Sequence, residues 1–183
     1  MSLRPAVFLD RDGTLTIECG YVTRPDQMRL IPGAARAVVK LRAAGFACVV
    51  VTNQSAVGRG LMTEPELIRV HAEMIRQLSD EGAALEGLYA CPAAPDQDDP
   101  DRKPAPGMLL RAARDLGIDL ARSWMVGDSA RDVLAGRTAG CRGCVLVRSG
   151  HDVTEARKVL DDRDAVATDL ADAARLILAA HLP

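Results

Sequence analysis

The sequence predicts an α/β fold of the doubly wound, Rossmann-like kind, with a parallel sheet and helices on both of its faces. Two observations support this prediction. Short apolar segments typical of buried strands alternate with longer amphipathic segments along the chain, and glycines follow several of the amphipathic segments, where they favour helix termination. Strands that alternate with helices form right-handed βαβ units, so the strands are expected to run parallel.

The expected strands are short segments rich in β-branched and other apolar residues, and they cover 6–10, 46–51, 85–91, 124–127, 144–147 and, as a small addition, 165–167. The expected helices have apolar residues at helical spacing, and they cover 32–44, 63–81, 106–116, 130–139 and 170–180. Thr63 is a good N-cap for the second helix because Glu66 follows three residues later. The stretch 92–104 is rich in Pro and Asp and is expected to be a loop.

Composition narrows the class of protein. The 183 residues are 48% hydrophobic and 26% charged, which is ordinary for one globular domain spanning 1–183. The net charge of −2 provides no general attraction to nucleic acid, and no apolar run reaches the roughly 20 residues that cross a bilayer. The odd count of five cysteines favours a reducing, cytoplasmic setting. A monomer without nucleic-acid or membrane partners is the default expectation.

The most informative motif is Asp10-Arg-Asp12-Gly13, which follows the first apolar strand directly. Alternate residues of an extended segment point to the same side, so both carboxylates can meet at the carboxyl end of the strand, where open α/β sheets bind ligands. Paired carboxylates suit Mg²⁺, and one of them can act as a nucleophile that becomes an aspartyl phosphate. The alternative is a surface turn or a calcium loop with two acidic residues.

Three further motifs follow apolar strands or open helices. Thr52, Asn53, Gln54 and Ser55 end the second strand and can hold phosphate oxygens, and Arg59 can place a cation near an anionic substrate. Arg102 and Lys103 open a helix, where an anion is favoured. Asp128 follows the fourth strand and would add a third carboxylate, and Asp132, one turn later, could orient a neighbour. Taken singly, each motif also fits a turn, a cap or a solvated charge.

The order and spacing of these four motifs resemble those of the haloacid dehalogenase superfamily of aspartate-nucleophile phosphatases over nearly the whole chain. More closely, the sequence is similar to the D-glycero-D-manno-heptose 1,7-bisphosphate 7-phosphatase family, to which histidinol phosphatases are related. The segments that carry this closer resemblance are Asp10–Leu15, Gly20–Val22, Thr52–Ser55, Gly58–Gly60, Cys91-Pro92, Arg102–Pro104, Pro106–Met108 and Leu146–Arg148.

The resemblance implies a role for each matching residue. Asp10 would be the nucleophile, Asp12 the general acid and base, and Thr52 and Lys103 the groups that stabilise the transferred phosphoryl group. Mg²⁺ would be held by Asp10, the backbone carbonyl of Asp12, and Asp128. The expected substrate contacts, including those inferred from the residues alone, are Glu18, Cys19, Gly20, Tyr21, Asn53, Gln54, Ser55, Arg59 and Arg102.

The sequence departs from this family in a loop that commonly binds zinc. Cys91 is present, but the other expected ligand positions are Ala93, Asp99 and Asp101. Structural zinc requires four sulfur or nitrogen ligands, so no zinc site is expected. The stretches between the motifs are too short for a large cap domain, so we expect an open site that only the loops 13–30 and 92–104 cover.

The resulting functional hypothesis is a Mg²⁺-dependent phosphatase that removes the 7-phosphate of D-glycero-D-manno-heptose 1,7-bisphosphate through an aspartyl phosphate. Such an enzyme makes heptose precursors for lipopolysaccharide or related glycans. Three alternatives share the residues: a histidinol-phosphate phosphatase, a phosphatase of another small phosphate ester, and a non-catalytic phosphosugar-binding module. A nucleic-acid 3′-phosphatase is disfavoured because the chain has no basic stripe.

Overall fold

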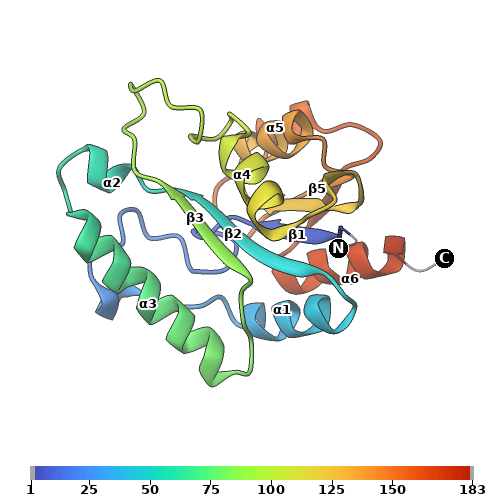
Figure 1. Cartoon of the computed structure of the whole chain (residues 1–183), viewed down its shortest axis with the longest axis horizontal. Helices are drawn as coiled ribbons and strands as arrows, with labels where there is room; N and C mark the ends of the chain where they lie inside the picture. The colour runs from blue at the N-terminus through green and yellow to red at the C-terminus, as the bar shows by residue number, and fades with distance from the viewer. Residues whose placement is uncertain (1–2, 182–183) are drawn as a thin grey trace.

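A computed structural model describes residues 3–181, and its centre is a six-stranded sheet (Figure 1). Every neighbouring pair of strands is parallel. The strands are β1 (Ala6–Leu9), β2 (Ala47–Asn53), β3 (Gly87–Cys91), β4 (Trp124–Gly127), β5 (Gly143–Val147) and β6 (Ala165–Ala167), in the spatial order β3-β2-β1-β4-β5-β6. The predicted doubly wound α/β fold is confirmed.

Helices cover both faces of the sheet (Figure 1). On one face, α1 (Ala34–Ala43), α3 (Glu64–Asp80) and α6 (Leu170–His181) share an apolar core with the sheet. On the other face, α4 (Gly107–Leu116) and α5 (Ala130–Ala139) build a second core. Side chains along β1 alternate between the two faces of the sheet and so contribute to both apolar cores: Val7 and Leu9 lie in the first core, and Phe8 lies in the second. Burial on both faces explains why the strands are almost wholly apolar.

The strand register brings the predicted motifs to one edge of the sheet. Leu9 of β1 pairs with Val50 of β2 on one side and with Val126 of β4 on the other. The residues that follow these positions therefore leave the sheet side by side. Strand order reverses between β1 and β4, and the crevice at such a point is where open α/β sheets bind ligands.

Several element boundaries differ slightly from the predicted ones. Helix α1 begins at Ala34 rather than at residue 32, because Gly33 has a φ of 85°, in the left-handed region, and cannot continue a right-handed helix. The short helix α2 (Ser55–Gly58) was not predicted. The expected cap of α3 is confirmed: the Thr63 hydroxyl accepts from the Glu66 amide at 3.4 Å, and the Glu66 carboxylate accepts from the Thr63 amide at 2.7 Å.

The expectation of no large cap domain agrees with the connections in residues 3–181. The segment from β1 to α1 contains one 3-10 turn, Pro25–Gln27, and the segment from β3 to α4 is a loop. Within this described part of the chain, none of the helices combines the length and the apolar character that a bilayer crossing requires.

His71 is a polar residue that the fold buries. It lies on α3 and is only 7% exposed, and its Nε2 atom has no hydrogen-bond partner among the described residues. Burial, assisted by the nearby positive charge of Arg11, lowers the pKa of His71 to about 4. The folded protein therefore keeps this imidazole neutral at pH values where the unfolded chain binds a proton.

This burial makes stability depend on pH. The unfolded imidazole takes up a proton below about pH 6.5, whereas the folded one does so only near pH 4, so the free energy of unfolding falls as the pH drops between these values. We predict that His71→Gln removes this dependence, which amounts to at most about 3 kcal/mol. Urea unfolding of both proteins from pH 7.5 to 4 measures it, and parallel stability curves would contradict the prediction.

Candidate active site

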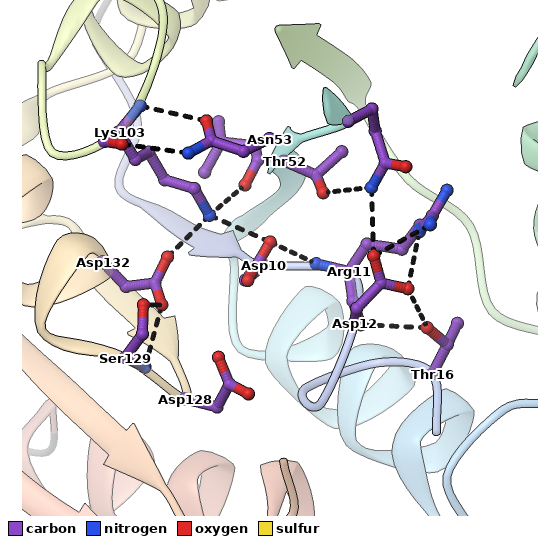
Figure 2. A network of polar contacts seen from close by, with 12 residues as sticks. Asp10, Arg11, Asp12, Thr16, Thr52, Asn53, Lys103, Asp128, Ser129 and Asp132 are labelled. Atoms are coloured by element: carbon purple, nitrogen blue, oxygen red, sulfur yellow. Dashed lines mark hydrogen bonds and ion pairs between the residues drawn. The ribbon is translucent and has the colours of Figure 1, made fainter. Parts of the chain in front are cut away.

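A cavity of about 90 Å³, open to solvent, lies at the carboxyl ends of the central strands. Its lining combines acidic and basic groups: Asp10, Asp12, Glu18, Asn53, Lys103, Asp128, Ser129, Arg131, Asp132 and His151. These residues come from segments far apart in the sequence, which the parallel sheet brings together; Figure 2 shows this for Asp10, Lys103 and Asp128.

Figure 2 shows the ammonium group of Lys103 between Asp10 and Asp132, and the residue is only 2% exposed. Its ammonium group contacts Asp10 Oδ1 at 2.9 Å and Asp132 Oδ1 at 2.6 Å, and it donates to the Val51 carbonyl at 2.9 Å. Burial alone would lower the pKa of Lys103, but the carboxylates of Asp10 and Asp132 together outweigh it and raise the pKa. The lysine is therefore a fixed positive charge beside Asp10.

Asn53, the last residue of β2, holds the Lys103 backbone in place (Figure 2). Its side-chain amide donates to the Lys103 carbonyl at 2.9 Å, and its side-chain oxygen accepts from the Lys103 amide at 3.0 Å. This reciprocal pair joins the loop before α4 to the sheet. Since a lysine side chain is flexible, fixing its backbone on both sides restricts where the ammonium group can lie.

Asp10 follows β1 and accepts a hydrogen bond from the Arg11 amide at 2.8 Å in addition to its contact with Lys103. Burial raises the pKa of Asp10 to about 7, Lys103 opposes this rise, and the neighbouring acids Asp132, Asp128 and Asp12 add to it. Burial, and to a lesser extent the excess of acidic groups, thus disfavours the ionised form of Asp10. A cation bound at this cluster would favour ionisation.

The Asp12 carboxylate is held by residues on the other side from Lys103 (Figure 2). The buried Arg11 guanidinium pairs with both of its oxygens, at 2.9 and 2.8 Å. Thr16 donates to it at 3.2 Å, and the Gln54 side-chain amide donates at 3.0 Å. The same Gln54 amide nitrogen donates to the Thr52 hydroxyl at 2.9 Å. Asp12 therefore has a fixed orientation, although its side chain is still 18% exposed at the cavity.

Asp128 follows β4 and is enclosed by two glycines and a histidine. A β-carbon on Gly13 would lie 2.3 Å from the Asp128 carboxylate, and one on Gly150 would lie 1.9 Å from it, so both positions require glycine. His151 donates its backbone amide to Asp128 Oδ2 at 3.0 Å, and its Nδ1 lies 2.7 Å from the same oxygen. This hydrogen bond to Asp128 raises the pKa of His151, against opposing effects of burial and of Arg131.

Asp132 performs two structural tasks at the start of α5. Its Oδ2 accepts from the Ser129 amide at 3.0 Å and from the Ser129 hydroxyl at 2.6 Å, while its Oδ1 accepts from Lys103. The expectation that Asp132 orients a neighbour is confirmed, and the neighbour is Lys103.

The donor set fits a hard divalent cation. Carboxylate oxygens of Asp10, Asp128 and Asp132 lie within 4.8 Å of one another, and oxygen ligands of this kind suit Mg²⁺. Asp132 is already bound to Lys103 and Ser129, which leaves Asp10 and Asp128 with the freer oxygens. The Asp12 carboxylate belongs to neither metal-capable cluster found among the described residues. The other cluster joins Glu18 and His151 to Asp128.

The structure brings some of the predicted site residues to the cavity and leaves others away from it. Asp10, Asp12, Glu18, Asn53, Lys103 and Asp128 line the cavity. Thr52 and Gln54 are buried beside it, in contact with each other and, through Gln54, with Asp12. The remaining predicted substrate contacts do not line it: Cys19, Gly20, Tyr21, Ser55, Arg59 and Arg102.

Arg102 lies along the neighbouring loop. It donates to the Ala93 carbonyl at 2.7 Å and lines a separate surface depression over residues 95–105. In the same loop, Asp101 pairs with Arg111 of α4, and its amide donates to Asp99 at 2.8 Å. These are two of the positions where related sequences were expected to carry zinc ligands.

Sequence reasoning assigned no role to three residues that line the cavity: Ser129, Arg131 and His151. The missing signal was available for His151, because it stands shortly after β5, whose carboxyl end neighbours that of β4. Ser129 and Arg131 stand in the turn that starts α5, directly after Asp128. Extending the strand-end rule to every strand and to the first helical turn would have found all three.

The fold and this cluster of acids around a buried lysine are those of a haloacid dehalogenase-like hydrolase. A family model described as HAD-hydrolase-like matches residues 101–173. A crystal structure of D,D-heptose 1,7-bisphosphate phosphatase from B. bronchiseptica, complexed with magnesium and phosphate, superposes with a TM-score of 0.88 and 36% identity. It covers 98% of this chain and 99% of that one.

Sequence relatives narrow the class further. The D-glycero-β-D-manno-heptose-1,7-bisphosphate 7-phosphatase of Pasteurella multocida is 41% identical over 181 residues, which are 96% of this chain and 97% of the relative. The enzyme of the same name from Yersinia pestis is 41% identical over 184 residues, with 97% of each chain covered. The chain therefore belongs to the D-glycero-β-D-manno-heptose-1,7-bisphosphate 7-phosphatase family.

The contact between Asp132 and Lys103 leads to a prediction about catalysis. Asp132→Asn keeps an oxygen acceptor for Lys103 but removes the charge that fixes its ammonium group. We expect kcat for a phosphate ester to fall by about 10- to 100-fold while KM changes by less than about threefold. Steady-state kinetics measure this, with Asp80→Asn on the surface of α3 as the control. A large rise in KM with kcat unchanged would contradict it.

Proposed function

We propose that this protein is a Mg²⁺-dependent phosphatase that removes the 7-phosphate of D-glycero-β-D-manno-heptose 1,7-bisphosphate. The observation that carries the proposal is the 41% identity, over nearly the full length, to enzymes of that name. The contact between Asp10 and Lys103 supports it, because phosphoryl transfer depends mainly on placement and on neutralising negative charge. The β anomer and the heptose substrate are taken from the names of the relatives.

In the proposed mechanism, Asp10 attacks phosphorus. A bond forms between its carboxylate oxygen and phosphorus while the bond from phosphorus to the sugar oxygen breaks, and an aspartyl phosphate results. Lys103 stabilises the charge on the phosphoryl oxygens, and Thr52 assists it. The fixed position of the Lys103 ammonium group, with three contacts at 2.9 Å or less, supports this role.

Asp12 is the proposed general acid and then the general base. It gives a proton to the departing sugar alkoxide, and afterwards it takes a proton from the water that attacks the aspartyl phosphate, which frees Asp10 and inorganic phosphate. The bonds to Arg11, Thr16 and Gln54 hold its carboxylate in one orientation at the cavity. Gln54 thus helps to orient Asp12, and its contact with the sugar stays a separate prediction.

The proposed ligands of Mg²⁺ are Asp10, the backbone carbonyl of Asp12, and Asp128. When bound, the ion supplies positive charge against the phosphoryl oxygens and keeps Asp10 ionised. The relative from B. bronchiseptica was solved with magnesium and phosphate. On the side of this protein, the packing of Gly13 and Gly150 against Asp128 holds that carboxylate at the cluster.

We also propose that the chain acts as one domain, as a monomer and in the cytoplasm. Its substrate would be a small phosphosugar rather than a nucleic acid or a lipid surface. Glu18 and Asn53 are the predicted substrate contacts that line the cavity. Tyr21 and Arg59 are exposed and stay predicted contacts of the sugar.

The proposal predicts a clear order of substrates. With Mg²⁺, the heptose bisphosphate should be hydrolysed with a kcat/KM at least about 100-fold above that of histidinol phosphate, because a site built around sugar contacts loses them with the smaller ester. Phosphate release from the α and β anomers and from histidinol phosphate measures it. Chelation of the metal should abolish turnover, and added Mg²⁺ should restore it.

Two variants complete this experiment. Asp10→Asn should reduce turnover to background, while Asp80→Asn, far from the cavity, should keep it. A preference for histidinol phosphate would leave the chemistry intact and overturn the substrate. Full activity in Asp10→Asn would overturn the assignment of the nucleophile.

A further inference from the structure

Two permanently cationic side chains line the cavity, and they differ in how they are engaged. Lys103 directs its ammonium group at Asp10, Asp132 and the Val51 carbonyl, so its donors are used in holding the reaction centre. Arg131 lines the same cavity, and its side chain makes no hydrogen bond or ion pair with any residue in the range 3–181. It is exposed, and its guanidinium is free to bind a ligand.

The position of Arg131 has no evident benefit for the fold. It is the second residue of α5, and a positive charge in the first turn of a helix is unfavourable because the helix dipole is positive there. The same turn already has a complete cap, since Asp132 accepts from both the amide and the hydroxyl of Ser129. Arg131 adds nothing to that cap. Neither the helix dipole nor the cap therefore explains why an exposed arginine stands at the cavity.

The other arginines expected near the substrate are placed differently. Arg102 uses its guanidinium on the Ala93 carbonyl and faces the depression along residues 95–105. Arg59 is exposed just after α2 and does not line the cavity. Among these three arginines, Arg131 alone both lines the cavity and has a free guanidinium.

The charges around the cavity show why such a group is needed. Five carboxylates line it, namely those of Asp10, Asp12, Glu18, Asp128 and Asp132. A substrate with a phosphate at each end brings one phosphate to Asp10, and the other must lie against this acidic lining. Without a nearby cation, that second phosphate is repelled. A guanidinium binds phosphate through two parallel hydrogen bonds, which suits it to this position.

We infer that Arg131 binds the second phosphate of the substrate, the one that is not transferred, and so selects bisphosphates over monophosphates. This inference rests on the proposed function, since it assumes a sugar bisphosphate. Arg131 acts as a specificity-determining residue at the start of α5, in the lining of the cavity.

The test compares two substrates that share the transferred phosphate: heptose 1,7-bisphosphate and heptose 7-phosphate. In Arg131→Gln, the KM for the bisphosphate should rise about tenfold with a smaller change in kcat, since a ground-state contact with a charged group is lost. The KM for the 7-phosphate should rise far less. Arg131→Lys should recover part of the loss, because lysine keeps the charge but not the paired hydrogen bonds.

Arg36→Gln is the matched control. Arg36 is also an exposed arginine in the first turn of a helix, α1, and it does not line the cavity, so its removal should leave both KM values unchanged. Arg102→Gln tests the rival assignment. Calorimetry in an Asp10→Asn background measures binding of the two substrates without turnover, and Arg131→Gln should remove the extra affinity for the bisphosphate.

The failures can be told apart. If the wild-type protein hydrolyses both substrates, and Arg131→Gln weakens both equally or neither, the inference is wrong while the proposed function stands. The inference is also wrong if Arg102→Gln alone carries the selective loss. If the wild-type protein hydrolyses and binds neither heptose phosphate, the proposed function fails, and the role of Arg131 fails with it.

Discussion

The site depends on one buried cation, the ammonium group of Lys103, held between the carboxylates of Asp10 and Asp132. Removing a charged amine from water is costly, and two short ion pairs offset that cost only because the three side chains are fixed. Asp10 follows β1, Asp132 lies on α5 after β4, and Asn53 at the end of β2 fixes the Lys103 backbone. Residues that end or follow three neighbouring strands of the sheet thus all contact Lys103.

Most of the fold followed from the sequence because parallel strands buried on both faces have an unmistakable pattern. The helices also carried local signals, such as the Thr63 cap that the structure confirms. Two features could not be predicted from that pattern. Apolar segments that are alike carry no information on which strands are neighbours, so the order β3-β2-β1-β4-β5-β6 needed the structure. Helix α2 has four residues, too few for any periodicity to show.

The candidate site was predictable to the extent that its residues follow strands directly, as Asp10 and Asp128 do. The role of each individual polar residue could not be predicted in this way. A sequence does not tell whether an amide side chain faces a substrate or another part of the protein, and Asn53 and Gln54 do the latter as well: one holds the Lys103 backbone, and the other donates to Asp12 and Thr52. Arg131 and His151 line the cavity but were missed, because the strand-end rule was applied neither to the first turn of α5 nor to the segment after β5.

If Asp10 carries the phosphoryl group while Lys103 stabilises it, the phosphorylated enzyme can be trapped during turnover. Enzyme is mixed with heptose bisphosphate labelled at the 7-phosphate, quenched in acid within milliseconds, and digested for peptide mapping. We expect the label on the peptide that contains Asp10, in a form that hydroxylamine releases as it does from an acyl phosphate. We expect less label in Lys103→Met. Turnover without any labelled protein, or a label on another residue, would contradict it.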